Sequence, residues 1–216
     1  MTYARARANM VDRQLRPNRV DDPRVLAAMG EVPRELFVPR HLRGVAYSDE
    51  DLDLGDGRRL IEPLVLARMV QAAEVRPQDS ALVVGDDTGY CAAVLSRLAS
   101  TVFLLAPDAA RTEAIDRLLT EAGYDNVVVH IGEPRVGLPQ LAPFDVILLA
   151  GSIVVEPRHL LEQLADGGRL VAVMMRGLAG RITVWKRVGE AIGATSPFDA
   201  AIPPLSALLP EPSFVF

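Results

Sequence analysis

The sequence predicts an α/β fold built on an open, doubly wound and mostly parallel β-sheet. From residue 81 onward, short apolar runs alternate with segments of helical periodicity. Most of these runs are continuously apolar, as in parallel strands that are covered on both faces. Right-handed crossovers between such strands give a sheet that is wound in both directions from its centre.

The composition indicates a globular protein with a sizeable core. The chain has 216 residues, of which 50% are hydrophobic and 24% charged. We expect one compact unit, in which residues 1–78 form a helical segment with a loop and residues 79–216 form the sheet domain with C-terminal strands. The net charge of −5 argues against a nucleic-acid partner, because phosphate binding needs a basic face.

The first third of the chain predicts helices joined by a polar loop. A helix is expected over Met10–Leu15. A second begins at Pro23, with Asp22 as its N-cap. Residues 46–59 are rich in acid and glycine, which predicts a loop or an irregular hairpin. Helical spacing returns after Pro63.

The remaining elements follow from the alternating pattern. The predicted strands are Ala81–Val84, Thr101–Leu105, Val127–His130, Val146–Ala150, Leu170–Met174 and Ile182–Arg187. The predicted helices are Tyr90–Leu98, Ala109–Ala122 and His159–Leu164. The last residues, 203–216, are apolar and rich in proline. They are expected either to pack across the sheet or to contact another chain, so an oligomer stays possible.

The leading candidate site is the turn Gly85–Gly89, which follows the first predicted strand. Ligands of doubly wound sheets bind at the carboxyl ends of the strands. The alternative is that the glycines only allow a tight turn from strand to helix. Asp86 and Asp87 would repel a phosphate, and no Lys-Ser/Thr pair follows, which excludes a P-loop. A neutral or cationic nucleoside, such as S-adenosylmethionine with its sulfonium, suits these charges better.

No metal site and no membrane segment are expected. Cys91 is the single cysteine, and the three histidines are far apart with no ligand spacing. The N-terminus lacks an apolar signal core, and no apolar run approaches the ~20 residues that a spanning helix needs. A soluble cytoplasmic protein is the resulting expectation.

Several longer stretches carry a resemblance to a known family. They are "MVDRQL", "DPRVLAAMGEVPRELFVP", "AYSDEDLDLGDG", "VVGDDTGYCAAVLSRLA", "GYDNVVVHIGE", "APFDVILLAG" and "LLEQLADGGRLVAVM". Over nearly its whole length the chain resembles the protein-L-isoaspartate O-methyltransferases. The resemblance implies a Rossmann-like methyltransferase fold with an N-terminal helical segment and a C-terminal extension. It also implies S-adenosylmethionine as cofactor and, as substrate, a damaged protein that carries isoaspartyl residues. The substrate carboxylate is itself the nucleophile, so few side chains are obligatory for catalysis.

The resemblance assigns cofactor-binding positions, several of which depart from the family pattern. Val83 stands where the family has an acid before the first glycine. Asp87 replaces the middle glycine, and its side chain is expected to crowd the methionine part of the cofactor. Ala106 replaces the acid that binds the ribose hydroxyls, a loss of ~2–3 kcal/mol. Glu133 keeps an acid that is one methylene longer. The full set of cofactor positions is Val83, Gly85, Asp86, Asp87, Gly89, Ala106 and Glu133.

The substrate loop of the family aligns with "GRRLIEP". The catalytic positions that the resemblance implies are Arg59, Ile61 and Glu62, with Ile61 in place of the hydroxyl residue that meets the substrate carboxylate. An arginine here would bind a carboxylate with two parallel hydrogen bonds, whereas Glu62 would repel one. The alternative is a solvated charged patch with no catalytic role.

Three functional hypotheses follow. The first is an active methyltransferase that repairs isoaspartyl proteins. The second is a family member without catalysis that serves as a binding or regulatory protein. The third is an enzyme that kept the fold and changed its ligand. Because the departures concentrate at ligand-facing positions, all three hypotheses remain open.

Overall fold

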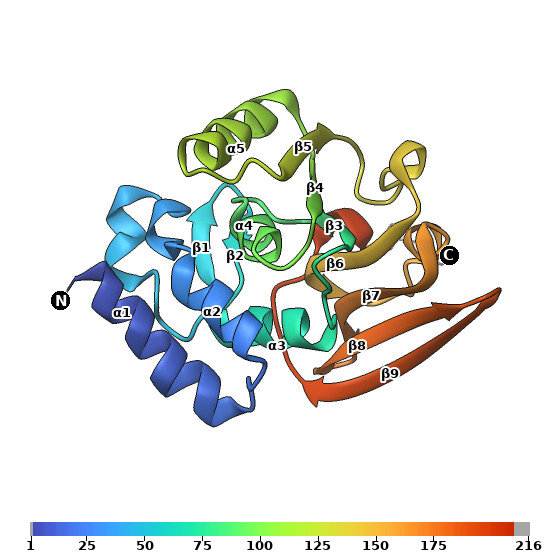
Figure 1. Ribbon diagram of the computed structural model, residues 1–216, viewed down its shortest axis with the longest axis horizontal. Coiled ribbons are helices and arrows are strands. Elements are labelled where there is room, and N and C mark those ends of the chain that lie inside the picture. Colours follow the sequence, from blue (N-terminus) through green and yellow to red (C-terminus); the bar gives the residue numbers. More distant parts are fainter. Residues whose placement is uncertain (1, 210–216) are drawn as a thin grey trace, which may run out of the picture.

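The computed structural model describes residues 2–209 (Figure 1). Its main sheet has the strand order β5-β4-β3-β6-β7-β8-β9. The pairs from β5 to β7 are parallel and the last two pairs are antiparallel. The strands are β3 Ser80–Val84, β4 Thr101–Ala106, β5 Val127–Ile131, β6 Phe144–Ile153, β7 Leu164–Arg176, β8 Ala179–Val188 and β9 Ala191–Asp199. The predicted doubly wound, mostly parallel sheet is confirmed.

The winding direction of the sheet reverses between β3 and β6. From β3 the chain passes through α4 (Tyr90–Ser96) to β4, and through α5 (Ala109–Glu121) to β5. It then returns to the other side of β3 to form β6, and continues through α6 (Arg158–Leu161) to β7. A crevice forms outside the carboxyl ends of two strands whose connections run in opposite directions. The ends of β3 and β6 therefore mark the place where a ligand site is expected.

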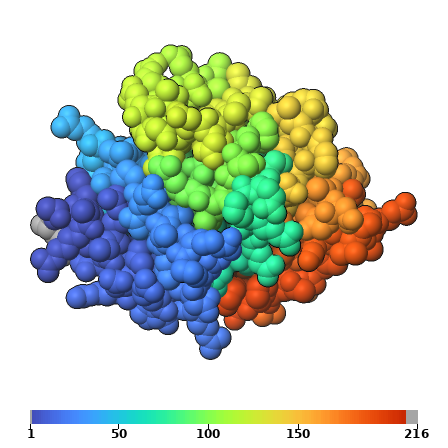
Figure 2. Space-filling view, viewed as in Figure 1, coloured from blue at the N-terminus to red at the C-terminus, as the bar shows by residue number. Residues whose placement is uncertain are grey.

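The N-terminal segment is helical and includes a small hairpin. Helix α1 (Tyr3–Met10) continues as a π-helix (Val11–Leu15), and α2 covers Pro23–Glu31. Short 3₁₀ turns follow at Arg16–Asn18, Arg34–Leu36 and Arg40–Val45. Strands β1 (Leu52–Gly55) and β2 (Arg58–Leu60) form an antiparallel hairpin, and α3 covers Pro63–Ala72. In Figure 2 the N-terminal segment, in blue, lies directly against the green middle of the chain.

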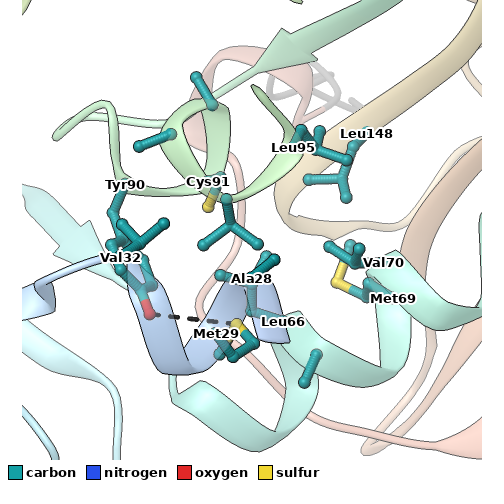
Figure 3. Close-up of a cluster of buried hydrophobic side chains, with 14 of the residues drawn as sticks. Ala28, Met29, Val32, Leu66, Met69, Val70, Tyr90, Cys91, Leu95 and Leu148 are labelled. Atoms are coloured by element: carbon teal, nitrogen blue, oxygen red, sulfur yellow. Dashed lines mark hydrogen bonds between the residues drawn. The ribbon is translucent and has the colours of Figure 1, made fainter. Parts of the chain in front are cut away.

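Helices α2, α3 and α4 meet in a shared apolar core (Figure 3). Met29 of α2 and Leu66 of α3 are fully buried, and both lie near Tyr90 at the start of α4. The Tyr90 hydroxyl donates a weak hydrogen bond to the Met29 sulfur at 4.0 Å. The same core reaches Leu148 of β6. This packing holds the N-terminal segment on the sheet, while the boundary expected near residue 78 stays a prediction.

The structure corrects several predicted boundaries. The first helix begins at Tyr3, seven residues before the predicted start at Met10, because the Thr2 hydroxyl caps it by accepting a hydrogen bond from the Arg5 amide. The helix expected over His159–Leu164 ends at Leu161, and Leu164 already belongs to β7. Strand β9 was not predicted. It is a mostly exposed edge strand with little apolar alternation, so its sequence carries little signal.

After β9 the chain returns across the carboxyl edge of the sheet. Ile202 is buried, and the residues that follow lie beside the end of β6. A 3₁₀ turn at Ser206–Leu208 comes next, drawn in red beside β3 in Figure 1. Residues 203–209 therefore pack across the sheet, which is one of the two alternatives expected for the C-terminal residues. Residues 210–216 lie outside the described part of the chain.

Candidate functional site

The turn between β3 and α4 depends on its two glycines. Gly85 has a φ of +84° and Gly89 a φ of +85°, a left-handed backbone that glycine adopts without strain. A Cβ atom on Gly89 would also come within 2.9 Å of Ile115 Cγ2. Both glycines are thus needed for the turn itself, whether or not it holds a ligand.

Asp86 faces into the protein at the start of α4. Only 5% of the residue is exposed. Its carboxylate accepts hydrogen bonds from the amides of Thr88, Gly89 and Ala92 at 3.1, 2.9 and 3.1 Å. It accepts a fourth from the Thr88 hydroxyl at 2.9 Å. The Thr88 and Gly89 amides lie just before α4 and the Ala92 amide lies in its unpaired first turn, so the charge of Asp86 stabilises the loop and the start of the helix.

Asp87 connects three parts of the chain. One carboxylate oxygen lies 2.9 Å from Arg111 Nη1 of α5, and the other accepts a hydrogen bond from the Arg59 amide of β2 at 3.3 Å. Burial raises the pKa of Asp87, and the hydrogen bond from the Arg59 amide, followed by the charge of Arg111, partly offsets the shift. Its backbone is outside the left-handed region, so no strain arises from an aspartate at this position. The side chain acts as a clamp between the loop, the hairpin and α5.

A small cavity of about 180 Å³ opens at the carboxyl ends of β3, β4 and β6. It brings together the hairpin, the β3–α4 loop, the start of α5 and the C-terminal segment. Its lining residues are Gly57, Arg59, Ile61, Gly85, Asp86, Asp87, Leu105, Pro107, Arg111, Pro134, Ala150 and residues 203–207. Five positions expected from the sequence therefore converge on one place: Arg59, Ile61, Gly85, Asp86 and Asp87.

Four other expected cofactor positions do not line this cavity. Val83 is buried inside β3, and Gly89 is buried where α4 begins. Ala106 is 1% exposed at the end of β4, and its carbonyl accepts a hydrogen bond from the Gly132 amide. Glu133 is exposed and lines a different, wider groove. The cofactor roles of these four residues stay predictions.

Glu62 lies half-buried in front of α3, also outside the cavity. Its amide donates to the Asp51 carboxylate at 2.8 Å. Burial, followed by repulsion from Asp51 and Asp49, raises the pKa of Glu62 to about 7. A catalytic role for Glu62 stays a prediction. Close to neutral pH its negative charge is only partial, which weakens the repulsion that the sequence suggests for a substrate carboxylate.

Two residues that shape this crevice were not among the expected site positions. Arg111 is the charged partner of Asp87, and Leu205 lies against the β3–α4 loop. The distance between residues 85 and 205 in the chain hides the second contact. The separation of 24 residues between Asp87 and Arg111 hides the first, since the local spacing of Arg111 indicates only its pairing with Asp108.

The crevice has the right position for a nucleoside cofactor but lacks the volume. Pockets for ligands of that size occupy about 300 Å³ or more, whereas this cavity measures about 180 Å³. The chain segment 203–207 fills part of the space. Asp108, which follows the end of β4, caps α5 by accepting from the Arg111 amide at 2.8 Å. With residues 203–207 in this position, the cavity is smaller than S-adenosylmethionine requires.

Other kinds of site find little support in the described chain. Across residues 2–209, no group of three or more His, Cys, Asp or Glu side chains is arranged to hold a metal ion. Within that same range, no helix has the length and apolar character needed to cross a membrane. Cys91 is fully buried, and burial raises the pKa of its thiol well above the usual value. That thiol packs in the core.

The family model and the relatives that match this chain carry the same family name. A family model described as protein-L-isoaspartate(D-aspartate) O-methyltransferase matches residues 6–194. The chain is 38% identical over 205 residues to the protein-L-isoaspartate O-methyltransferase of Roseiflexus castenholzii, covering 95% of this chain and 94% of that one. It is 41% identical over 162 residues to the protein of the same name from Protochlamydia amoebophila, covering 75% of this chain and 77% of that one.

A solved structure shares the fold. It is a β-aspartate methyltransferase (PCMT) from Plasmodium falciparum in complex with S-adenosyl-L-homocysteine. The two folds superpose with a TM-score of 0.79 at 17% sequence identity, over 92% of this chain and 97% of that chain. At this identity the likeness establishes the architecture of the chain.

Proposed function

The chain belongs to the protein-L-isoaspartate(D-aspartate) O-methyltransferase family, and we propose that it is an S-adenosylmethionine-dependent enzyme that methylates isoaspartyl carboxylates in damaged proteins. The observation that carries this proposal is the continuous match, which includes 38% identity to a relative over 95% of the chain. The match spans both the hairpin and the carboxyl edge of the sheet. We also propose a cytoplasmic location, which the absence of any possible intrachain disulfide supports.

The reaction makes modest demands on the protein. The cofactor supplies a methyl group on a positively charged sulfur, and the substrate carboxylate already is a nucleophile. The protein must orient that carboxylate and remove water from around it. The crevice between the ends of β3 and β6 supports this task, because Ile61 on its wall is apolar and only 2% exposed.

Arg59 is the best-placed residue to bind the substrate carboxylate. It lines the cavity, and its guanidinium pairs with Asp53 at 3.0 Å. Both partners are largely exposed, with side-chain exposures of 44% and 59%. Such a surface ion pair contributes no more than ~1 kcal/mol, so Arg59 can exchange Asp53 for a substrate carboxylate at little cost.

A methyl-transfer assay on matched peptides tests the proposed function. One peptide carries an isoaspartyl residue, and the other carries an ordinary aspartyl residue in the same sequence. We expect labelled methyl from S-adenosylmethionine to enter only the isoaspartyl peptide. Absence of transfer to either peptide, at saturating cofactor and with folded protein, would reject the proposal.

The Arg59→Met variant tests the role of Arg59 in the same assay. Loss of a charged hydrogen-bond donor to the substrate is expected to raise KM for the peptide by about tenfold or more. The KM for the cofactor should change little. Arg58→Met is the matched control, because Arg58 is a neighbour on β2 that does not line the cavity. Equal increases in the peptide KM for the two variants would show that the loss of a positive charge near the site, and not a contact made by Arg59, causes the effect.

A further inference from the structure

The C-terminal segment extends the sheet edge next to the crevice. The Ser152 amide donates to the Pro203 carbonyl at 2.9 Å, and the Leu205 amide donates to the Ser152 carbonyl at 2.8 Å. Pro204 forms a parallel bridge with Ser152. Residues 203–205 thus act as a short added strand beside the carboxyl end of β6.

This added strand directs Leu205 into the crevice. A Cβ atom on Gly85 would lie 2.5 Å from Leu205 Cδ1 and 3.1 Å from Leu205 Cδ2. A Cβ atom on Gly151 would lie 2.9 Å from Leu205 Cβ. The leucine side chain therefore lies between the ends of β3 and β6, where the winding of the sheet reverses. Ligands of doubly wound sheets bind at this reversal point.

The segment is held by few interactions and has a well-anchored start. Ile202 is buried, and the Ala200 amide donates to the Gly180 carbonyl at 3.0 Å. Beyond Ile202, Pro204 and Ser206 are exposed and Leu205 is only partly buried. Few buried contacts and exposed backbone mark a segment that opens at low free energy. Residues after Ile202 can leave the crevice while the fold stays intact.

The far end of the segment rests on a second surface. The Arg135 guanidinium donates to the Leu209 carbonyl, and Leu208 lines a wide groove of about 1220 Å³ together with Arg135. Leu208 and Leu205 are therefore in different environments. Leu208 lies on the groove, and Leu205 lies against the β3–α4 loop. Both leucines also pack against the same apolar cluster of the sheet.

We infer that residues 203–209 form a plug that occupies the cofactor crevice and must withdraw before S-adenosylmethionine binds. The inference rests on the proposed function and adds regulation of cofactor binding at the same site. Because the closed form has no room for the cofactor, the apparent affinity equals the intrinsic affinity multiplied by the fraction of open molecules. Any event that draws the segment out of the crevice would activate the enzyme.

Calorimetric titration with S-adenosyl-L-homocysteine tests the plug. In Leu205→Ala the side chain that fills the crevice is shortened, and we expect the dissociation constant to fall by about tenfold because the open fraction rises. Leu178→Ala is the control, because Leu178 is fully exposed outside this segment, and it should change the dissociation constant by less than about twofold. An equal or weaker affinity of Leu205→Ala, relative to the unmodified protein, would overturn the inference.

Amide hydrogen exchange gives a second readout that does not depend on a substitution. In the free protein the Leu205 amide is bonded to the Ser152 carbonyl and should be modestly protected, by about tenfold or more, because the closed form predominates. Saturation with S-adenosyl-L-homocysteine should make it exchange at least about tenfold faster. Amides inside β3 should keep their protection. Unchanged protection of Leu205 at saturation would overturn the plug.

The outcomes separate the plug from the proposed function. Cofactor binding and isoaspartyl methylation by the unmodified protein, with no gain in Leu205→Ala, would overturn the plug and leave the function standing. Failure of the unmodified protein and of Leu205→Ala to bind S-adenosyl-L-homocysteine, with both folded, would reject both. Tighter binding by Leu205→Ala without methyl transfer would support the plug and reject the repair activity.

Discussion

Asp87 and Arg111 form an ion pair across the candidate site, with 2.9 Å between Asp87 Oδ1 and Arg111 Nη1. The resemblance implies a glycine at this position, so the sequence suggests only steric crowding by the aspartate. The structure shows that its carboxylate also binds the Arg59 amide. A residue that breaks a motif thus connects the loop to α5 and to the hairpin.

A double-mutant cycle of Asp87→Ala and Arg111→Met should give a coupling free energy of about 1 kcal/mol, the upper end for partly exposed pairs. Urea unfolding of the two single variants and the double variant measures it. Glu113 and Arg117 form the matched control, since this pair on α5 is 74% and 64% exposed. Its coupling should be about 0.3 kcal/mol. Equal couplings for the two pairs would contradict the clamp.

Asp86→Ala should destabilise the fold by about 3 kcal/mol. The substitution removes a buried carboxylate acceptor and leaves buried amides at the start of α4 without a partner. Asp86→Asn keeps one acceptor oxygen and should cost less. Asp108→Ala is the control, because Asp108 caps α5 at an exposed position and should cost about 1 kcal/mol. Urea denaturation measures all three, and a cost for Asp86→Ala no greater than for Asp108→Ala would be inconsistent with the buried acceptor.

Glu62→Gln should stabilise the protein in a pH-dependent way. The pKa of Glu62 is about 7 in the folded state, above its ordinary value of 4.5. Below pH 4.5 the carboxyl is protonated in both states and no penalty exists. As pH rises to about 7, the unfolded state loses the proton first, so stability falls. Glutamine has no such proton, so the gain in Tm should grow between pH 4.5 and 7 and then level off.

The groups that face Glu62 fix the direction of this effect. Burial raises its pKa most, Asp51 and Asp49 raise it further, and Arg68 and Arg34 lower it. Solvent screening of this half-exposed side chain reduces the size of the effect. Glu190→Gln, at an exposed turn, is the control and should show no such growth. A gain in Tm that is constant with pH would disprove the coupling.

The resemblance implies that an acid at the position of Ala106 binds the ribose hydroxyls, so Ala106→Glu should raise the affinity for S-adenosyl-L-homocysteine by about tenfold. Ala106→Gln is the matched control, with nearly the same size and no charge. Titration calorimetry on both variants decides the point. If Glu binds no more tightly than Gln, the ribose does not lie at this strand end.

The sequence predicted the sheet well because continuous apolar runs leave few alternatives. It also indicated the positions that line the crevice, since Gly85 and Asp87 follow the first strand of the sheet directly. It missed β9, whose exposed residues carry little periodic signal. It missed the orientation of Asp86, because charge alone does not tell which donors a carboxylate will face. It missed Leu205, because a contact across 120 residues has no local signature.

The inward orientation of Asp86 has a consequence for competing metabolites. A free helix N-terminus attracts anions, but here one carboxylate already accepts from the first turn of α4. The phosphates of a nucleoside triphosphate would therefore find these amides already bonded to Asp86. The occupied backbone amides would thus disfavour nucleotides relative to sulfonium nucleosides, without any contribution from contacts with the adenine ring.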